Sequence, residues 1–139
     1  AAMEELGTLE SRAFWREVRD VAPLAAARDA VVWKISCPPT EGPAIVARLK
    51  ALRPAAEAFY DWSGGLVWLA LPASADADHV AVRGAIGATG GHAMLIRAPE
   101  AVRAVVPVFH PQPPALAALA TRVKGSFDPR RLFNPGRMG

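Results

Sequence analysis

The chain has very little of what disulfide-stabilised or metal-stabilised domains depend on. Its 139 residues include one cysteine, Cys37, so no disulfide can form within the chain. The three histidines, His79, His92 and His110, are scattered and lack the spacing of a zinc site. A nucleophilic Cys37 would need a base and electropositive surroundings, which the sequence does not provide. We therefore predict one domain over residues 1–139, without a metal, in which Cys37 is a buried apolar residue in a reducing compartment.

Long apolar runs are also missing, although 52% of the residues are hydrophobic. No uninterrupted run approaches the roughly 18 residues that a membrane-spanning helix needs. The first residues are acidic and lead into no apolar stretch, so no secretory signal is predicted. We expect a soluble, cytoplasmic domain without a membrane span, and association with a membrane through partner subunits is an open alternative.

Acidic residues are slightly outnumbered, and the formal net charge of +3 raises the question of nucleic-acid binding. Most arginines stand next to acidic residues in the sequence, as Arg19 does beside Asp20, which is typical of a solvated helix face. The C-terminal residues from 122 to 137 hold five basic residues against a single acid, Asp128. We predict no nucleic-acid partner, and a basic C-terminal surface that could meet a flavin pyrophosphate, an acidic partner or only water.

Hydrophobic periodicity and turn signals predict an α+β domain. The expected strands cover residues 31–37, 56–62, 66–71 and 92–97, and the expected helices between them cover 40–53 and 76–90. This β-α-β-β-α-β order is that of a ferredoxin-like fold, an antiparallel sheet with both helices on one face. An N-terminal helix at 9–21, a loop at 24–30, a short helix at 100–106 and a C-terminal helix from 114 to Gly125, followed by a tail, complete the prediction.

The face of the sheet that its own helices leave open must meet water, a ligand or another domain. Alternation in the first strand places Trp33 on the covered face and Lys34 on the open face. We expect Lys34, Trp68 and His92 to share the open face, where a cation could hold a carboxylate and a histidine could exchange a proton near neutral pH. The alternative is that His92 satisfies a local backbone group and that Trp33, Trp62 and Trp68 are core or interface anchors.

Several motifs carry a resemblance to a known family. The tail reads Asp128-Pro129 and then Asn134-Pro135-Gly136-Arg137, two turns in close succession. It resembles the C-terminal signature of FAD-linked oxidases of the vanillyl-alcohol oxidase superfamily. Three upstream segments, 33–36, 61–65 with Trp68, and 90–93, resemble in the same order the FAD-binding E subunit of bacterial glycolate oxidase.

That resemblance implies that the chain is the C-terminal cap domain of such a subunit. Its partners would be its own N-terminal FAD-binding domain, a D-type flavin subunit, an iron–sulfur subunit and a small 2-hydroxy acid such as glycolate. Ala1 is not an initiator residue, which suits a fragment, and the chain has no glycine-rich loop for the FAD pyrophosphate. We expect the chain alone to be inactive and without cofactor, because the flavin would perform the oxidation.

In the intact subunit, Asn134, Arg137, His92 and Lys34 are the residues expected to contact FAD or to hold the tail at its domain. No catalytic residue is assigned, since catalysis could belong to the D-type subunit. The alternative is a self-sufficient ferredoxin-like module that binds a small ligand or another chain on its open sheet face.

Overall fold

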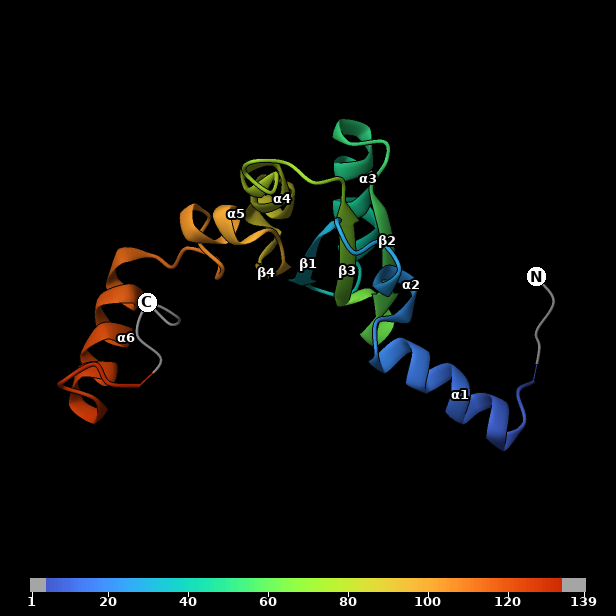
Figure 1. The fold of residues 1–139 in the computed structure, drawn as a ribbon, viewed down its shortest axis with the longest axis horizontal. Coiled ribbons are helices and arrows are strands. Elements are labelled where there is room, and N and C mark those ends of the chain that lie inside the picture. The colour runs from blue at the N-terminus through green and yellow to red at the C-terminus, as the bar shows by residue number, and fades with distance from the viewer. Residues whose placement is uncertain (1–4, 134–139) are drawn as a thin grey trace.

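The computed structural model describes residues 5–133 of the chain (Figure 1). The central elements are β1 (Val31–Ser36), α3 (Gly42–Leu52), β2 (Glu57–Asp61), β3 (Leu66–Leu71), α4 (His79–Ile86) and β4 (His92–Arg97). Short 3-10 turns precede β3 and β4, namely η1 (Trp62–Gly64) and η2 (Gly87–Thr89). The helices α1 (Thr8–Arg19) and α2 (Ala22–Ala25) come before this unit, and α5 (Glu100–Val105) and α6 (Pro114–Phe127) follow it.

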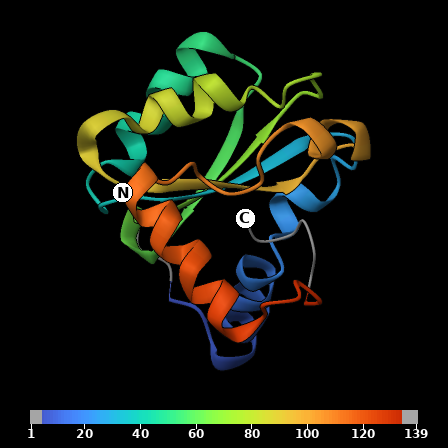
Figure 2. The same cartoon turned by 90° about the vertical axis from the view of Figure 1, so that its left-hand side faces the viewer.

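The four strands form one antiparallel sheet in the order β2-β3-β1-β4. The two central strands, β1 and β3, are paired without a break from Val31 opposite Leu71 to Ser36 opposite Leu66. Helices α3 and α4 contact each other and lie on the same face of the sheet (Figure 2). This is the arrangement of a ferredoxin-like fold, so the predicted α+β class is confirmed.

The main hydrophobic core lies between the sheet and these two helices. Every second residue of β1, namely Val31, Trp33 and Ile35, is fully buried and points to the helices, as the alternation predicts. The other fully buried large side chains come from β3, β4, α3 and α4: Val67, Leu69, Leu71, Leu95, Ile45, Leu49 and Val82. The core therefore uses one face of the sheet and leaves the other for other contacts.

Strands β3 and β4 have the predicted limits, whereas three details of the helices were predicted wrongly. Helix α4 ends before Gly87, which has a φ of 58°, and not at the later glycine pair. Val80, expected on its inner face, is 69% exposed because it lies in the first turn on the outer side. Helix α6 continues through Gly125 to Phe127, since one glycine in an exposed helix costs only about 1 kcal/mol relative to alanine.

Helix α2 occupies part of the segment that was predicted as a loop. Its Leu24 is buried against Val32 and Ala70, which lie on the face of the sheet opposite to α3 and α4. Val21 and Ala30 pack against the same cluster. Helix α2 therefore covers one end of this face.

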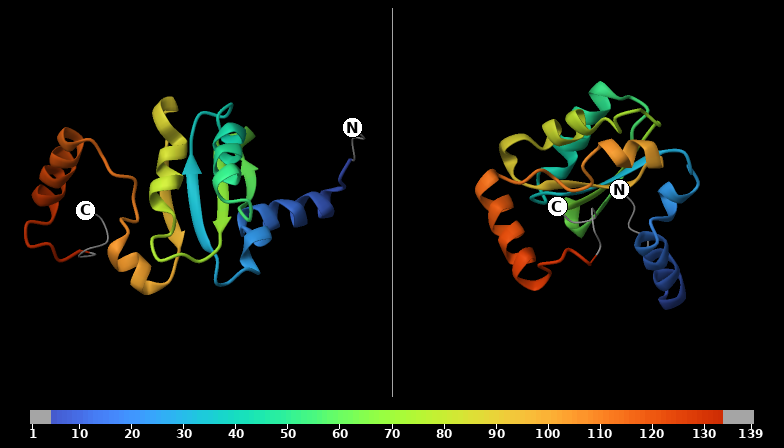
Figure 3. Two further views of the ribbon diagram at one scale, coloured as in Figure 1. Left: turned by 90° about the horizontal axis from the view of Figure 1, so that it is seen from above. Right: turned by 60° about the vertical axis from the view of Figure 1, so that its left-hand side comes forward.

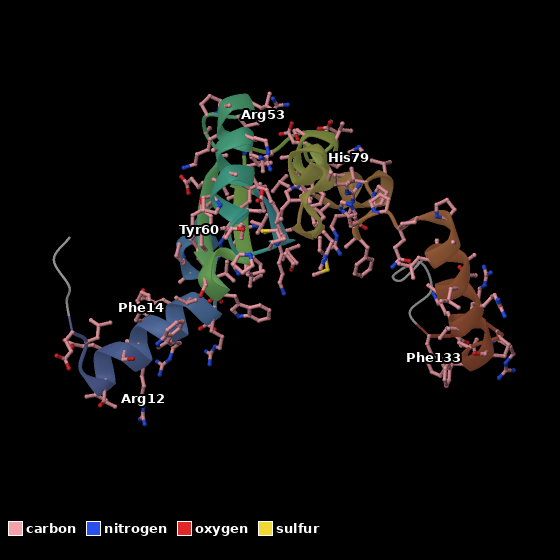
Figure 4. The ribbon with its side chains drawn as sticks, turned by 180° about the vertical axis from the view of Figure 1, so that it is seen from behind. Arg12, Phe14, Arg53, Tyr60, His79 and Phe133 are labelled. Carbon is pink, nitrogen blue, oxygen red and sulfur yellow. The ribbon has the colours of Figure 1, made fainter. Side chains whose placement is uncertain are left out.

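Helices α1 and α6 project from the domain at opposite ends of the sheet (Figures 1 and 4). Seen along the sheet, both lie on the side of its open face, away from α3 and α4 (Figure 2, and Figure 3, right). None of their residues is buried, so the apolar stripes that the sequence predicts for these helices are exposed. The exposed apolar side chains are Leu9, Phe14 and Trp15 on α1 and Leu116, Leu119, Val123 and Phe127 on α6.

Candidate functional site

The open sheet face carries an aromatic and cationic row across three strands, next to the cluster that α2 covers. Lys34 of β1 stands directly opposite Trp68 of β3, which in turn stands opposite Phe59 of β2. The Lys34 ammonium lies 5.7 Å from the centre of the Trp68 ring, and the rings of Trp68 and Phe59 are stacked with their centres 6.4 Å apart. This geometry is a cation–π contact on an aromatic platform.

His92 lies on the same face as this row. It begins β4 opposite Ser36, which is two residues along β1 from Lys34 and therefore on the same side of the pleat. The prediction that Lys34, Trp68 and His92 share the open face is confirmed. His92 is exposed, and Met94 fills the position of β4 next to Lys34.

Lys34 is a half-buried lysine whose ammonium pairs with no carboxylate among residues 5–133. The ion pairs found among residues 5–133 are those of Arg19 with Asp20 and of Arg53 with Asp78, and neither involves Lys34. Its only specific contact in that part of the chain is with the Trp68 ring. The ammonium group is thus able to bind an anionic group of a ligand or of another domain.

Arg97 holds α2 on the sheet. Its guanidinium group donates hydrogen bonds to the carbonyl oxygens of Leu24, Ala27 and Ala30, at 3.0, 2.6 and 3.0 Å. Between α2 and the sheet remains a groove of about 220 Å³, which we call the α2 groove. It is lined by Asp20, Val21, Leu24, Ala25, Val32, Trp68, Ile96 and Arg97. This groove was not predicted, because the loop expected at 24–30 includes the end of α2.

His110 has a structural role at the outer edge of β4. Its Nδ1 atom accepts a hydrogen bond of 3.3 Å from the backbone N–H of Ala93. Burial lowers the pKa of His110, and the nearby charges of Arg83 and His92 lower it further. Its segment therefore covers the outer edge of β4, where Leu95 also donates to the Val108 carbonyl.

Arg83 of α4 secures the same segment. It donates hydrogen bonds to the carbonyl oxygens of Pro107 and Phe109, and its guanidinium carbon lies 5.4 Å from the centre of the Trp33 ring. Burial lowers the pKa of Arg83. Arg83 thus connects the core to the chain that leads into α6.

The Asp128-Pro129 motif of the tail has a clear structural explanation. The carboxylate of Asp128 accepts hydrogen bonds from the backbone N–H groups of Leu132 and Phe133, at 2.9 and 2.8 Å. These bonds, that of Phe133 first, hold the pKa of Asp128 below its usual range. The motif therefore forms a turn directly after α6. Asn134 and Arg137, predicted to contact FAD, lie outside the described residues.

Cys37 has the surroundings of an unreactive thiol. Cys37 was predicted to be buried but is only half-buried. Its Sγ atom lies 3.8 Å from the Gly64 carbonyl oxygen. Burial, and secondarily the charge of Glu41, raise the pKa of its thiol, which disfavours the reactive thiolate. Among residues 5–133 there is no cluster of three or more side chains suited to hold a metal ion. The helices of this part of the chain are all too short or too polar to cross a membrane.

Comparison of the chain with known protein families, with curated proteins and with solved structures found no match.

Proposed function

We propose that this chain is the C-terminal cap domain of the FAD-binding E subunit of a glycolate oxidase, and that its open sheet face lies toward the flavin. The observation that carries this proposal is the row formed by Lys34 and Trp68 with His92 beside it, on the sheet face opposite to the main core. A polar and aromatic face of this kind suits a shared active site better than a solvated surface.

The side chains on the open sheet face have the chemistry to bind a flavin and a hydroxy acid there. The flavin would accept the hydride from the substrate. Lys34 would bind the substrate carboxylate or a flavin oxygen, because its ammonium has no acidic partner among residues 5–133. Trp68 would exclude water from the bound groups, and exposed His92 would donate a hydrogen bond from the edge of the site.

The two projecting helices support a missing partner domain. Both α1 and α6 extend past the open face at its two ends and expose aromatic and aliphatic side chains (Figure 3). Phe14 packs edge-to-face on Trp15, with ring centres 5.5 Å apart, yet both rings are about half exposed. Large apolar patches of this kind usually mark surfaces that another domain covers. A flavin domain seated between the helices would cover them and the open face together.

A second reading is a self-sufficient module that binds a small ligand on its own. The feature in its favour is that the four-stranded sheet, with its two covering helices, is complete and encloses a fully buried core. The coding sequence ahead of residue 1 separates the two readings. An FAD-binding domain encoded there, in frame, supports the cap domain. A start codon for Met3 with a stop codon upstream would support the module.

The site is tested by Lys34→Met in the intact subunit, assembled with its partners. We expect an increase in the KM for glycolate, because the variant removes the carboxylate anchor and keeps the aliphatic stem against Trp68. The matched control is Lys50→Met, which removes the same charge from α3, a helix on the covered side of the sheet. Equal kinetics for the Lys34 variant and the wild type would contradict the assignment of Lys34.

A further inference from the structure

The α2 groove is an open, mainly apolar groove between two elements that are distant in sequence, with the charged side chains of Asp20 and Arg97 also among its lining residues. Its floor is formed by the side chains of Val32, Trp68 and Ile96, each from a different strand. Its opposite wall is formed by Val21, Leu24 and Ala25 at α2. A volume of about 220 Å³ is below the roughly 300 to 1,000 Å³ of pockets for drug-sized ligands, so it suits a short alkyl chain or one small ring.

A cation stands next to this groove. Val32 and Lys34 are two residues apart on the same face of β1, which separates them by about 7 Å. Trp68 joins the two, since it lines the groove and its ring also contacts the Lys34 ammonium. Arg97 is less able to bind an anion, because its Nε and one terminal nitrogen already donate to three backbone carbonyls.

We infer that the α2 groove binds the apolar side chain of an anionic substrate whose carboxylate is held by Lys34. The preferred ligand is therefore a 2-hydroxy acid with an aliphatic side chain of several carbons, in addition to glycolate, which has none. The 2-hydroxy acid as ligand class rests on the proposed function, whereas the groove and its neighbouring cation do not.

The test is an NMR titration of the 139-residue chain with 2-hydroxy acids of increasing chain length: glycolate, 2-hydroxybutanoate, 2-hydroxyhexanoate and 2-hydroxydecanoate. Each methylene that enters the groove should strengthen binding about threefold to fourfold. The gain should stop once the groove is filled, and the shifted signals should be those of Val32, Trp68 and Ile96. Affinity that does not depend on chain length, or shifts confined to other residues, would overturn the inference.

Two variants fill the groove from opposite sides. Ile96→Trp does so from the sheet and Ala25→Trp from α2, and both positions are exposed, so the larger side chain can be accommodated. Each should weaken binding of 2-hydroxyhexanoate about tenfold or more and leave glycolate unchanged. Val80→Trp is the control, because it adds the same ring to an exposed position of α4, on the other side of the sheet. Undiminished binding in both groove variants would overturn the inference.

The position of the carboxylate is tested separately. Lys34→Met should weaken 2-hydroxyhexanoate binding about fivefold, as loss of a partly exposed ion pair would, and Lys50→Met should not. Failure of the proposed function gives a different result from failure of this inference. If no flavin domain is encoded upstream, the proposed oxidase function fails, but the dependence of affinity on chain length should remain. If a flavin domain is encoded and affinity does not depend on chain length, only the inference about the groove fails.

Discussion

Replacing Trp33 by phenylalanine tests whether the contacts assigned to the centre of the core determine the stability of the domain. The Trp33 ring is fully buried, and its Nε1 donates a 2.9 Å hydrogen bond to the carbonyl of Ala77, a residue that is itself fully buried. Phenylalanine cannot donate this bond, and an unsatisfied buried carbonyl costs about 1 to 3 kcal/mol. The smaller ring also leaves a void, at a cost of about 1 to 2 kcal/mol. We expect the free energy of unfolding to fall by roughly 2 to 5 kcal/mol.

The matched control is Trp62→Phe. Trp62 is 73% exposed, so the same chemical change should alter the free energy of unfolding by no more than about 0.5 kcal/mol. Urea unfolding followed by far-UV circular dichroism measures both variants. The slope of the free energy of unfolding against urea concentration should be the same as in the wild type. A loss for Trp33→Phe below about 1 kcal/mol, or an equal loss for both variants, would refute the assignment of Trp33 as the centre of the core.

Other regions of the domain allow equally specific tests. Gly42→Ala should destabilise the fold by about 1 to 3 kcal/mol, because its Cβ would collide with the Gly64 carbonyl oxygen. Gly84→Ala lies in the exposed part of α4, where a Cβ meets nothing within 4 Å, and should stabilise the fold by up to about 1 kcal/mol. Thermal unfolding compares these two variants, and opposite signs are the expected result. The pKa of His110 is lowered in the folded state, so the unfolded chain binds more protons and stability should decrease as the pH falls below about 6.5. His110→Asn keeps an acceptor for the Ala93 N–H and removes the titration, so a pH dependence as steep as that of the wild type would exclude this role.

The sequence by itself determined the strands, their alternation and the fold class. The pattern from Val31 to Cys37 assigns Trp33 to the core and Lys34 to the other face, because successive side chains of a strand point to opposite sides whatever the rest of the chain does. The same local rule placed Trp68 and His92 correctly. This rule could not show that His92 lies opposite Ser36, two residues along β1 from Lys34. The strand order of the ferredoxin-like fold, which places β4 beside β1, made this proximity expected.

Only the tertiary structure decided what covers the open face and the edge of β4. Arg97 and Leu24 are separated by 73 positions, and no local pattern links a guanidinium group to the carbonyls of a segment that distant. The α2 groove depends on this link, since α2 has four residues and too few turns to be a stable helix without the sheet beneath it. In the same way, His110 meets Ala93 only because the chain after α5 runs along an edge strand whose N–H groups need acceptors. Periodicity reports which face of an element is buried, whereas the partner that buries it depends on the apolar surface and the unpaired backbone groups that remain once the sheet has formed.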